Sequence, residues 1–394
     1  MIALLLVMAG TFAARSALWY QTADFFCLYH GGRSLALGVD PYDDAVWQAA
    51  TGGLYPAPGG GVDVPPCPGR YGYPLWTAVA LLPLGVLPIE LASTVWMTLS
   101  IGAAILGLLA AWRAFGGTAR YAGLFAVSVV MSQPFWIFLM SGQVSGVTLG
   151  LAGIVAWSLA RGRERSGGVA LALLALKPQT SGITIPIVFL QAVAQRRRRF
   201  VAAALVAGAV MVLVPFLFVP GWPIEWLGEI GGRRLRVISQ MPTAWGFAAQ
   251  TVGNEAWGAV FLVAVVLLTA RIAWGHAGPL VVFVLSLPLS LLATPYAWTY
   301  DYLVLAVAWG FIFVCAGRLH GETRGTLLLV AALALAVLGP WVFYAVSFTR
   351  GEEALSAALA AGTALVVSAA ARASRPSRDG GSATRPTGPA ARGA

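Results

Sequence analysis

Long apolar runs, separated by short polar segments, dominate the chain. A helix that spans a bilayer needs about 20 mainly apolar residues. Ten runs approach this length, and they lie at 2–20, 91–112, 121–140, 144–160, 200–219, 256–274, 278–293, 302–317, 325–347 and 354–371. The pattern predicts an all-α, polytopic membrane protein with about ten full transmembrane helices. No small-residue cleavage site follows the first run near Tyr20, so we interpret that run as a span.

Two further apolar stretches are interrupted. The stretch at 73–88 is short and carries Pro74, Pro83 and Pro88, and the stretch at 167–195 is too long for one span and contains Lys177-Pro178. Proline removes a backbone donor and breaks a helix. We therefore expect two broken or re-entrant helical elements, each of which enters and leaves the membrane on the same side.

Charge supports this interpretation and sets an orientation. Hydrophobic residues make up 59% of the chain, charged residues only 10%, and the mean hydropathy is +0.79. Soluble proteins carry about 25% charged residues, so a soluble enzyme, a disordered protein and a nucleic-acid-binding module are excluded. With both broken stretches re-entrant, most of the 25 basic residues fall on one side, which the positive-inside rule makes cytoplasmic.

This orientation predicts a multi-pass protein of the plasma membrane with both termini in the cytoplasm. Residues 1–372 form the transmembrane domain, with long outer loops at 21–72 and 220–255. The Gly-, Ser-, Pro- and Arg-rich tail at 373–394 is predicted to be disordered, basic and in contact with membrane lipids.

The outer loops carry most of the candidate chemistry. Asp24 follows the first run directly, and the spacing of Phe25, Leu28 and Leu35 predicts a short amphipathic helix on the membrane. Asp24 is either a carboxylate that interacts with the helix dipole or a functional group at the lipid boundary. Asp40 suits a turn as well as a substrate site.

Two other outer tips add polar side chains. Gln143 lies between two spans, and Asp301 opens a later span after Tyr296 and Tyr300. Aromatic residues are normal at a membrane interface, whereas a carboxylate there must meet water, a cation or a donor.

Basic residues away from the cytoplasmic side are the candidate phosphate ligands. Lys177, the only lysine, either neutralises the helix break or binds a lipid-linked phosphate. Arg233, Arg234 and Arg236 form an outer cluster that is either plain surface or a second phosphate contact.

Other residue types exclude several kinds of site. Cys27 and Cys67 share one outer loop and could form a disulfide, whereas Cys315 lies in a span. The three histidines are scattered, and no Walker, GxGxxG, HExxH or Ser-His-Asp pattern occurs. ATP-driven transport and metalloprotease chemistry are therefore unsupported, and we predict no metal and no cofactor.

Four stretches in series resemble glycosyltransferase family 87, the polyprenyl-phosphate-mannose-dependent α-mannosyltransferase-like group with the C-type glycosyltransferase fold. They are DFFCLYHGGRSLALGVDPYD (24–43), YGYPLWTAVALLPLGVLP (71–88), SGQ with GGVALALLALKPQ (141–179) and ATPYAWTYDY (293–302). Some members carry a histidine where this chain has Tyr300.

The resemblance implies a membrane hexosyltransferase. It would move a sugar, with mannose as the first expectation, from a polyprenyl-phosphate donor to a lipid or glycan acceptor on the outer face. Asp24 matches the family's general base. We expect Tyr29, Asp40, Gln143, Lys177, Arg233, Arg234, Tyr296, Tyr300 and Asp301 to bind substrate. The alternative is a transporter or flippase for a lipid-linked or anionic solute, although the broken stretches lie in one half only.

Overall fold

The computed structural model describes residues 24–51, 71–232, 234–275, 278–348 and 353–374, and these residues contain helices and no strand. The predicted span at 2–20 and the tail beyond 374 lie outside the described residues. The helices are α2 (Asp24–Ala36), α3 (Asp44–Thr51), α4 (Leu75–Gly85), α5 (Ile89–Ala114), α6 (Ala119–Val130), α7 (Gln133–Ser141), α8 (Ser145–Arg161), α9 (Glu164–Leu173), α10 (Thr184–Ala194), α11 (Arg198–Leu213), α12 (Trp222–Gly232), α13 (Ala244–Val252), α14 (Trp257–Ala273), α15 (Pro279–Ala293), α16 (Ala306–Arg318), α17 (Thr323–Leu333), α18 (Gly339–Phe348) and α19 (Ala357–Ala373).

Short 3₁₀ and π segments extend several of these helices. They are η1 (Leu174–Leu176), η2 (Pro178–Thr180), η3 (Val214–Leu217), η4 (Arg234–Gln240), η5 (Thr299–Leu305), η6 (Ala334–Leu338) and η7 (Ala354–Ser356). The all-helical class predicted from the sequence is thus confirmed for the described residues.

Among the described residues, five helical segments are long and apolar enough to cross a membrane. They are α5, α11 with η3, η5 with α16, the segment from α17 to α18, and η7 with α19. Each coincides with one of the predicted spans. Three more predicted spans correspond to the shorter apolar helices α8, α14 and α15. The total of about ten spans stays a prediction.

The predicted span at 121–140 is not one straight helix. It consists of α6 and α7, which are bent by 52° at a short break. Pro134, in the first turn of α7, cannot continue a helix from the preceding residues because it lacks the N–H. Met131 lies in the break, and its carbonyl accepts a hydrogen bond from Trp341 Nε1 at 2.7 Å. The bent pair would form a sixth span if it is counted as one.

The stretch at 73–88 is also different from the prediction. It forms a single helix, α4, rather than a hairpin, and Pro74 and Pro88 stand at the N-caps of α4 and α5. Proline is tolerated at helix starts, so these two prolines separate consecutive helices instead of folding one element back on itself. Pro83 falls within the last turn of α4.

Helix α2 is confirmed as a helix, but it does not expose a polar face. Phe25, Leu28 and Leu35 are buried, and so are Phe26 and Tyr29 on the intervening positions. Helix α4 packs so closely against α2 that a Cβ on Gly32 or Gly85 would collide with the backbone of the opposite helix. The expectation that this helix has an exposed polar face is therefore wrong, whereas its position at the membrane surface stays a prediction.

The break at Lys177-Pro178 is confirmed. The chain leaves α9, passes through η1 and η2 and returns as α10, and Lys177 has the non-helical angles φ −131° and ψ 80°. Arg197 Nε, after α10, lies 3.4 Å from Glu164 Oε1 at the start of α9. Both arms therefore return to the same end of the molecule. We call residues 164–194 the re-entrant hairpin and residues 174–183 its tip.

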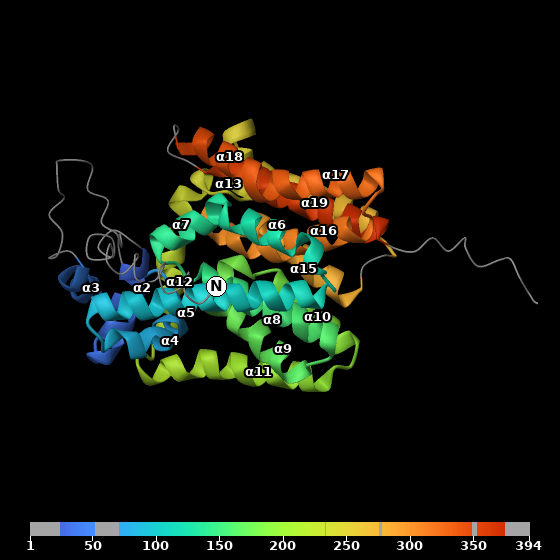
Figure 1. Cartoon of the computed structure of the whole chain (residues 1–394). Helices are drawn as coiled ribbons and strands as arrows, with labels where there is room; N and C mark the ends of the chain where they lie inside the picture. The colour runs from blue at the N-terminus through green and yellow to red at the C-terminus, as the bar shows by residue number, and fades with distance from the viewer. Residues whose placement is uncertain (1–23, 52–70, 233, 276–277, 349–352, 375–394) are drawn as a thin grey trace, which may run out of the picture.

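The arginine-rich helix ends gather at the end of the bundle where this hairpin begins. Helices α5 and α8 run parallel, with Gly107 next to Gly150, so their C-termini lie together. Arg318, at the end of α16, donates to the Phe115 carbonyl just after α5. We call this the arginine end, and the opposite end, which holds the hairpin tip, the site end (Figure 1).

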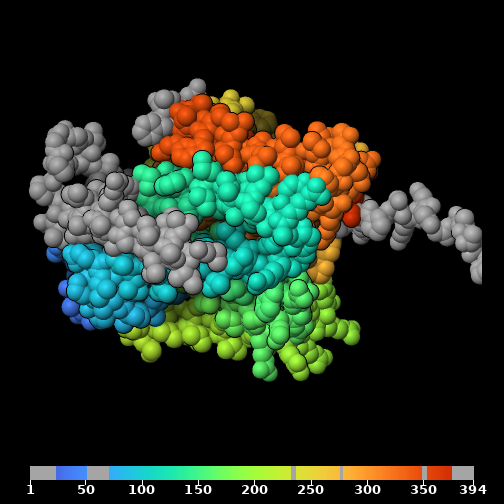
Figure 2. All heavy atoms as spheres, viewed as in Figure 1, coloured from blue at the N-terminus to red at the C-terminus, as the bar shows by residue number. Residues whose placement is uncertain are grey.

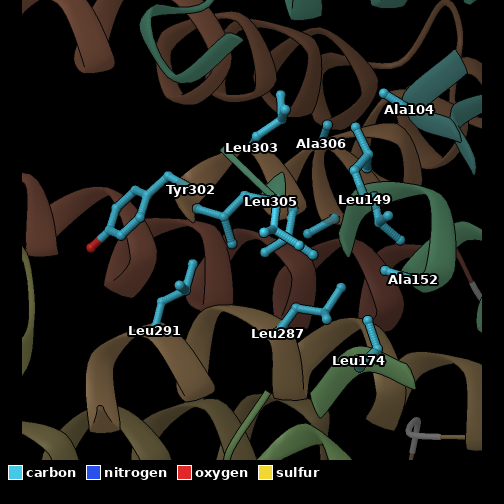
Figure 3. Close-up of a cluster of buried hydrophobic side chains, with 14 of the residues drawn as sticks. Ala104, Leu149, Ala152, Leu174, Leu287, Leu291, Tyr302, Leu303, Leu305 and Ala306 are labelled. Carbon is cyan, nitrogen blue, oxygen red and sulfur yellow. The ribbon is translucent and has the colours of Figure 1, made fainter. Parts of the chain in front are cut away.

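The segment made of η5 and α16 is the centre of the fold. Eighty-nine per cent of its apolar window is buried, against 17% to 67% for the other candidate spans. Figure 3 shows Leu303 and Leu305 of this segment packed among side chains of α5, α8, η1 and α15. The C-terminal helices and α9–α11 form opposite sides of the surface, with α5–α7 between them (Figure 2). A residue at the start of η5 is therefore held by the most deeply buried of the five candidate spans in the described residues.

Candidate functional site

Lys177 stands at the centre of a buried polar cluster at the site end. Its Nζ lies 2.5 Å from Asp301 Oδ1, and the exposed fractions of the two side chains are 2% and 0%. The same Nζ donates to Gln143 Oε1 at 2.9 Å and lies 4.3 Å from the ring centroid of Tyr300. The three ligands of the ammonium come from two other tips of the fold, so the cluster joins segments distant in sequence.

Helix α4 holds the hairpin tip that carries Lys177. Trp76 Nε1 donates to the Ala175 carbonyl at 2.8 Å, and Thr77 Oγ1 donates to the Leu176 carbonyl at 2.9 Å. These carbonyls precede the break at Pro178, where the regular helical hydrogen bonds are lost. Polar side chains of α4 thus replace the missing backbone donors and fix the backbone on the N-terminal side of Lys177.

Gln143 is positioned by a tight turn between α7 and α8. Gly142 adopts φ +65°, which favours glycine, and its carbonyl accepts from Trp96 Nε1 at 2.6 Å. A Cβ on Gly142 would lie 2.7 Å from the Phe25 Cβ. The turn therefore rests against the first residues of α2, immediately beside Asp24.

Asp301 uses its two carboxylate oxygens on different partners. Oδ1 pairs with Lys177, and Oδ2 accepts the Trp298 amide at 3.1 Å in a capping box at the start of η5. The amide of Thr299 is occupied by Glu353 Oε2 at 2.8 Å. These contacts satisfy amides that a helix start leaves without backbone partners.

Tyr300 connects the Lys177 cluster with the start of α2. Its ring lies against the Lys177 ammonium, and its hydroxyl is close enough to Asp24 for the carboxylate to act on it electrostatically. Asp301, Tyr296 and Tyr73 act on the same hydroxyl. Five predicted site residues, Asp24, Gln143, Lys177, Tyr300 and Asp301, are thus brought together.

Tyr296 lies at the edge of this cluster. Its hydroxyl accepts from Trp298 Nε1 at 3.0 Å, and its carbonyl accepts from Thr294 Oγ1 at 3.1 Å. Both contacts are local to the loop before η5. Tyr296 therefore shapes this loop.

Tyr29 and Asp40 are directed elsewhere. The Tyr29 hydroxyl donates to the Leu87 carbonyl at 2.8 Å and accepts from Arg33, so it joins α2 to the turn between α4 and α5. Asp40 Oδ1 accepts the Tyr42 amide at 2.8 Å, which is the turn geometry that the sequence also allowed.

The basic cluster is described only in part. Arg233 lies outside the described residues, and Arg234 begins η4, whose last residue, Gln240, accepts the Glu353 amide at 2.9 Å through its carbonyl. The η4 backbone therefore belongs to the site end.

The sequence analysis missed Tyr73. Its hydroxyl accepts from Gln143 Nε2 at 2.9 Å, and its carbonyl accepts from the buried Tyr42 hydroxyl at 2.6 Å. The chain Tyr73–Gln143–Lys177 fixes the orientation of the Gln143 amide. The sequence places this tyrosine directly before Pro74, in the interrupted apolar stretch at 73–88, and its hydroxyl could have marked it as a candidate. No sequence pattern indicated that Gln143 is its partner.

Two further residues near the start of α2 bear on the site. Cys27 is disulfide-bonded, and Cys67, the partner that the sequence allowed, lies outside the described residues. His30 is buried, and desolvation together with the nearby Arg33 lowers its pKa to about 4, so the imidazole is neutral at pH 7. Within the part of the chain that the structure describes, no group of three or more His, Cys, Asp or Glu side chains could hold a metal.

A cavity of about 520 Å³ lies at the arginine end, remote from this cluster. Tyr121, His320 and Glu322 contribute to its lining, and Arg120 Nη2 lies 2.5 Å from His320 Nε2 at its margin. The cavity lies between α6 and the turn from α16 to α17. Lys177 lies near the other end of α16, so the length of this helix separates the two.

The family model of glycosyltransferase family 87 matches residues 71–315, which is more than half of the chain, so the chain belongs to this family. No match is found among the curated proteins. The matched range contains Gln143, Lys177 and Asp301. Membership makes the protein a membrane glycosyltransferase.

Proposed function

We propose that this member of glycosyltransferase family 87 transfers a hexose, with mannose as the first candidate, from a polyprenyl-phosphate donor to a lipid or glycan acceptor. One observation carries the proposal. The chain's only lysine, at the tip of a re-entrant hairpin, lies against the ring of Tyr300, and the Asp24 carboxylate acts electrostatically on the hydroxyl of the same tyrosine. A cation and a carboxylate are thus available on neighbouring sides of one small region.

The reaction requires little more than these groups. Polyprenyl phosphate is a good leaving group, so bond cleavage needs a cation for the developing phosphate charge rather than a general acid. The acceptor hydroxyl needs a base, and in this proposal Asp24 removes its proton as the oxygen attacks the anomeric carbon. In this proposal Lys177 stabilises the departing phosphate together with Arg233 and Arg234.

The remaining site residues orient substrate in this proposal. Tyr300 and Asp301 contact the sugar-bearing region from η5, Gln143 contacts it from the α7–α8 turn, and Tyr296 borders it. Tyr29 supports helix α2, which begins at Asp24, and Asp40 supports the turn that follows this helix. Their hydrogen bonds to the Leu87 carbonyl and the Tyr42 amide favour this indirect contribution.

We further propose that the site end faces the outside of the plasma membrane. The arginine-rich helix ends lie at the opposite end, as the positive-inside rule requires of a cytoplasmic surface. A disulfide at Cys27 is compatible with the oxidising side only.

Loss of the base is the direct test. Asp24→Asn keeps the shape of the side chain and removes its basicity, so transfer should fall by about 10²–10⁴-fold. Asp43→Asn is the matched control, because Asp43 caps the start of α3 by accepting the Ala45 amide. Transfer retained in Asp24→Asn and lost in Asp301→Asn would assign the base to Asp301 instead.

Orientation is tested separately. A membrane-impermeant maleimide applied to intact cells should label Gln240→Cys, which is exposed at the site end, and should not label Arg198→Cys at the arginine end. Labelling of Arg198→Cys alone would place the site on the cytoplasmic side.

A further inference from the structure

Lys177 is already neutralised in this structure. Asp301 lies 2.5 Å from its ammonium, and both side chains are almost fully buried. An additional phosphate beside an intact pair would place two anions around one cation in a poorly solvated region. Like charges at short range are strongly unfavourable there, so simple addition of the donor to the pair is disfavoured.

Each member of the pair has a second partner that survives separation. Asp301 keeps the Trp298 amide on Oδ2, and Lys177 keeps Gln143 Oε1 and the face of the Tyr300 ring. Exchange of one anion for another at Lys177 therefore leaves neither side chain without a partner.

We infer that Asp301 is an internal counter-ion that occupies, on Lys177, the place taken by the phosphate of the substrate. The ligand class is a prenyl phosphate monoester or diester. This inference rests on the proposed function, and it adds to it that Asp301 competes with the phosphate of the substrate for Lys177.

The inference predicts that removal of the Asp301 charge strengthens, rather than weakens, the binding of a phosphate ligand. If the pair is closed most of the time, the apparent dissociation constant of a phosphate ligand rises by the reciprocal of the open fraction. Asp301→Asn removes the competitor and should tighten binding of farnesyl phosphate by about 3–10-fold. Lys177→Met should weaken it by at least about 10-fold, because the cation is gone.

The experiment uses the full-length protein in detergent, with farnesyl phosphate as the probe and farnesol as the uncharged control. The dissociation constant and the ligand-induced change in melting temperature are measured for the wild type, Asp301→Asn, Asp301→Ser and Lys177→Met. Serine keeps an acceptor for the Trp298 amide without a charge. Glu353→Gln removes the nearby carboxylate that accepts the Thr299 amide, and it should lower stability without tightening binding.

Tighter binding in either Asp301 variant, with a larger ligand-induced stabilisation than in the wild type, supports the inference. Weaker or unchanged binding overturns it, and so does failure of both variants to fold, because Asp301 would then be a latch. Equal binding by wild type and Lys177→Met also overturns it. If the wild type does not distinguish farnesyl phosphate from farnesol, the donor class in the proposed function is wrong.

Discussion

The re-entrant hairpin carries an ion pair at each of its two ends, and the two pairs are physically different. At the tip, Lys177 Nζ and Asp301 Oδ1 are 2.5 Å apart, with exposed side-chain fractions of 2% and 0%. At the base, Arg197 Nε and Glu164 Oε1 are 3.4 Å apart, with exposed fractions of 14% and 29%. One end of the hairpin thus takes part in a desolvated pair, and the other end in a pair that is partly exposed.

The difference in burial shows at which end of the hairpin the fold requires the desolvation of charged side chains. The Arg197–Glu164 pair is partly exposed, so solvent screens its attraction, and pairs near the surface contribute only about 0–1 kcal/mol. A buried pair loses hydration on both ions, so it is weak evidence for stability, although removal of one partner is strongly unfavourable. The tip pair therefore points to chemistry, whereas the base pair only closes a loop.

Breaking the tip pair should have the largest effect on stability. Lys177→Met or Asp301→Asn leaves one buried partner without its counter-charge, which should lower the free energy of unfolding by about 3–5 kcal/mol. The double variant Lys177→Met/Asp301→Leu should lose less than either single variant. Thermal melting of the purified variants measures this, and additive losses in the double variant would show that the two side chains do not interact.

His30 should make stability at the site end depend on pH. Its folded pKa is about 4, against 6.5 unfolded, so the unfolded chain binds an extra proton between these values. Stability should therefore be full above pH 6.5 and should fall by about 3 kcal/mol in total as the pH decreases to 4. His30→Phe should flatten this part of the melting curve against pH. An unchanged slope in that variant would assign the dependence to other groups.

The contacts of α4 with the hairpin tip should have an intermediate effect. Thr77→Val leaves the Leu176 carbonyl without its 2.9 Å partner, which should cost about 1–3 kcal/mol. Thr98→Val is the matched control, because the exposed Thr98 hydroxyl donates only to the Thr94 carbonyl of its own helix. Similar melting temperatures for the two variants would mean that the tip backbone does not depend on α4.

These comparisons also show what the sequence could predict. Runs of apolar residues located most helices, and Lys177-Pro178 located the hairpin break, because both signals are local. The bend before Pro134 was missed. The Met131 carbonyl in the bend accepts a hydrogen bond from Trp341, and a contact with so distant a segment leaves no local signal in the sequence. Contacts between segments distant in sequence also explain a second gap. The sequence identified Gln143, Tyr300 and Asp301 as candidate site residues at outer tips, but it did not show that they contact Lys177. Tyr73 received no assignment because its role depends entirely on contacts made across the fold.

The smallest effect is expected at the base of the hairpin, and it makes the comparison quantitative. Arg197→Gln removes the charge that faces Glu164 but leaves an uncharged polar side chain, so stability should change by less than about 1 kcal/mol. Sugar transfer should stay at the wild-type level, because this pair lies at the arginine end and the hairpin remains anchored by its packing against α11. Melting temperature and transfer rate are measured beside Lys177→Met under the same conditions. A loss in Arg197→Gln as large as that in Lys177→Met would show that the hairpin depends equally on both ends, and burial would no longer explain the difference between the two pairs.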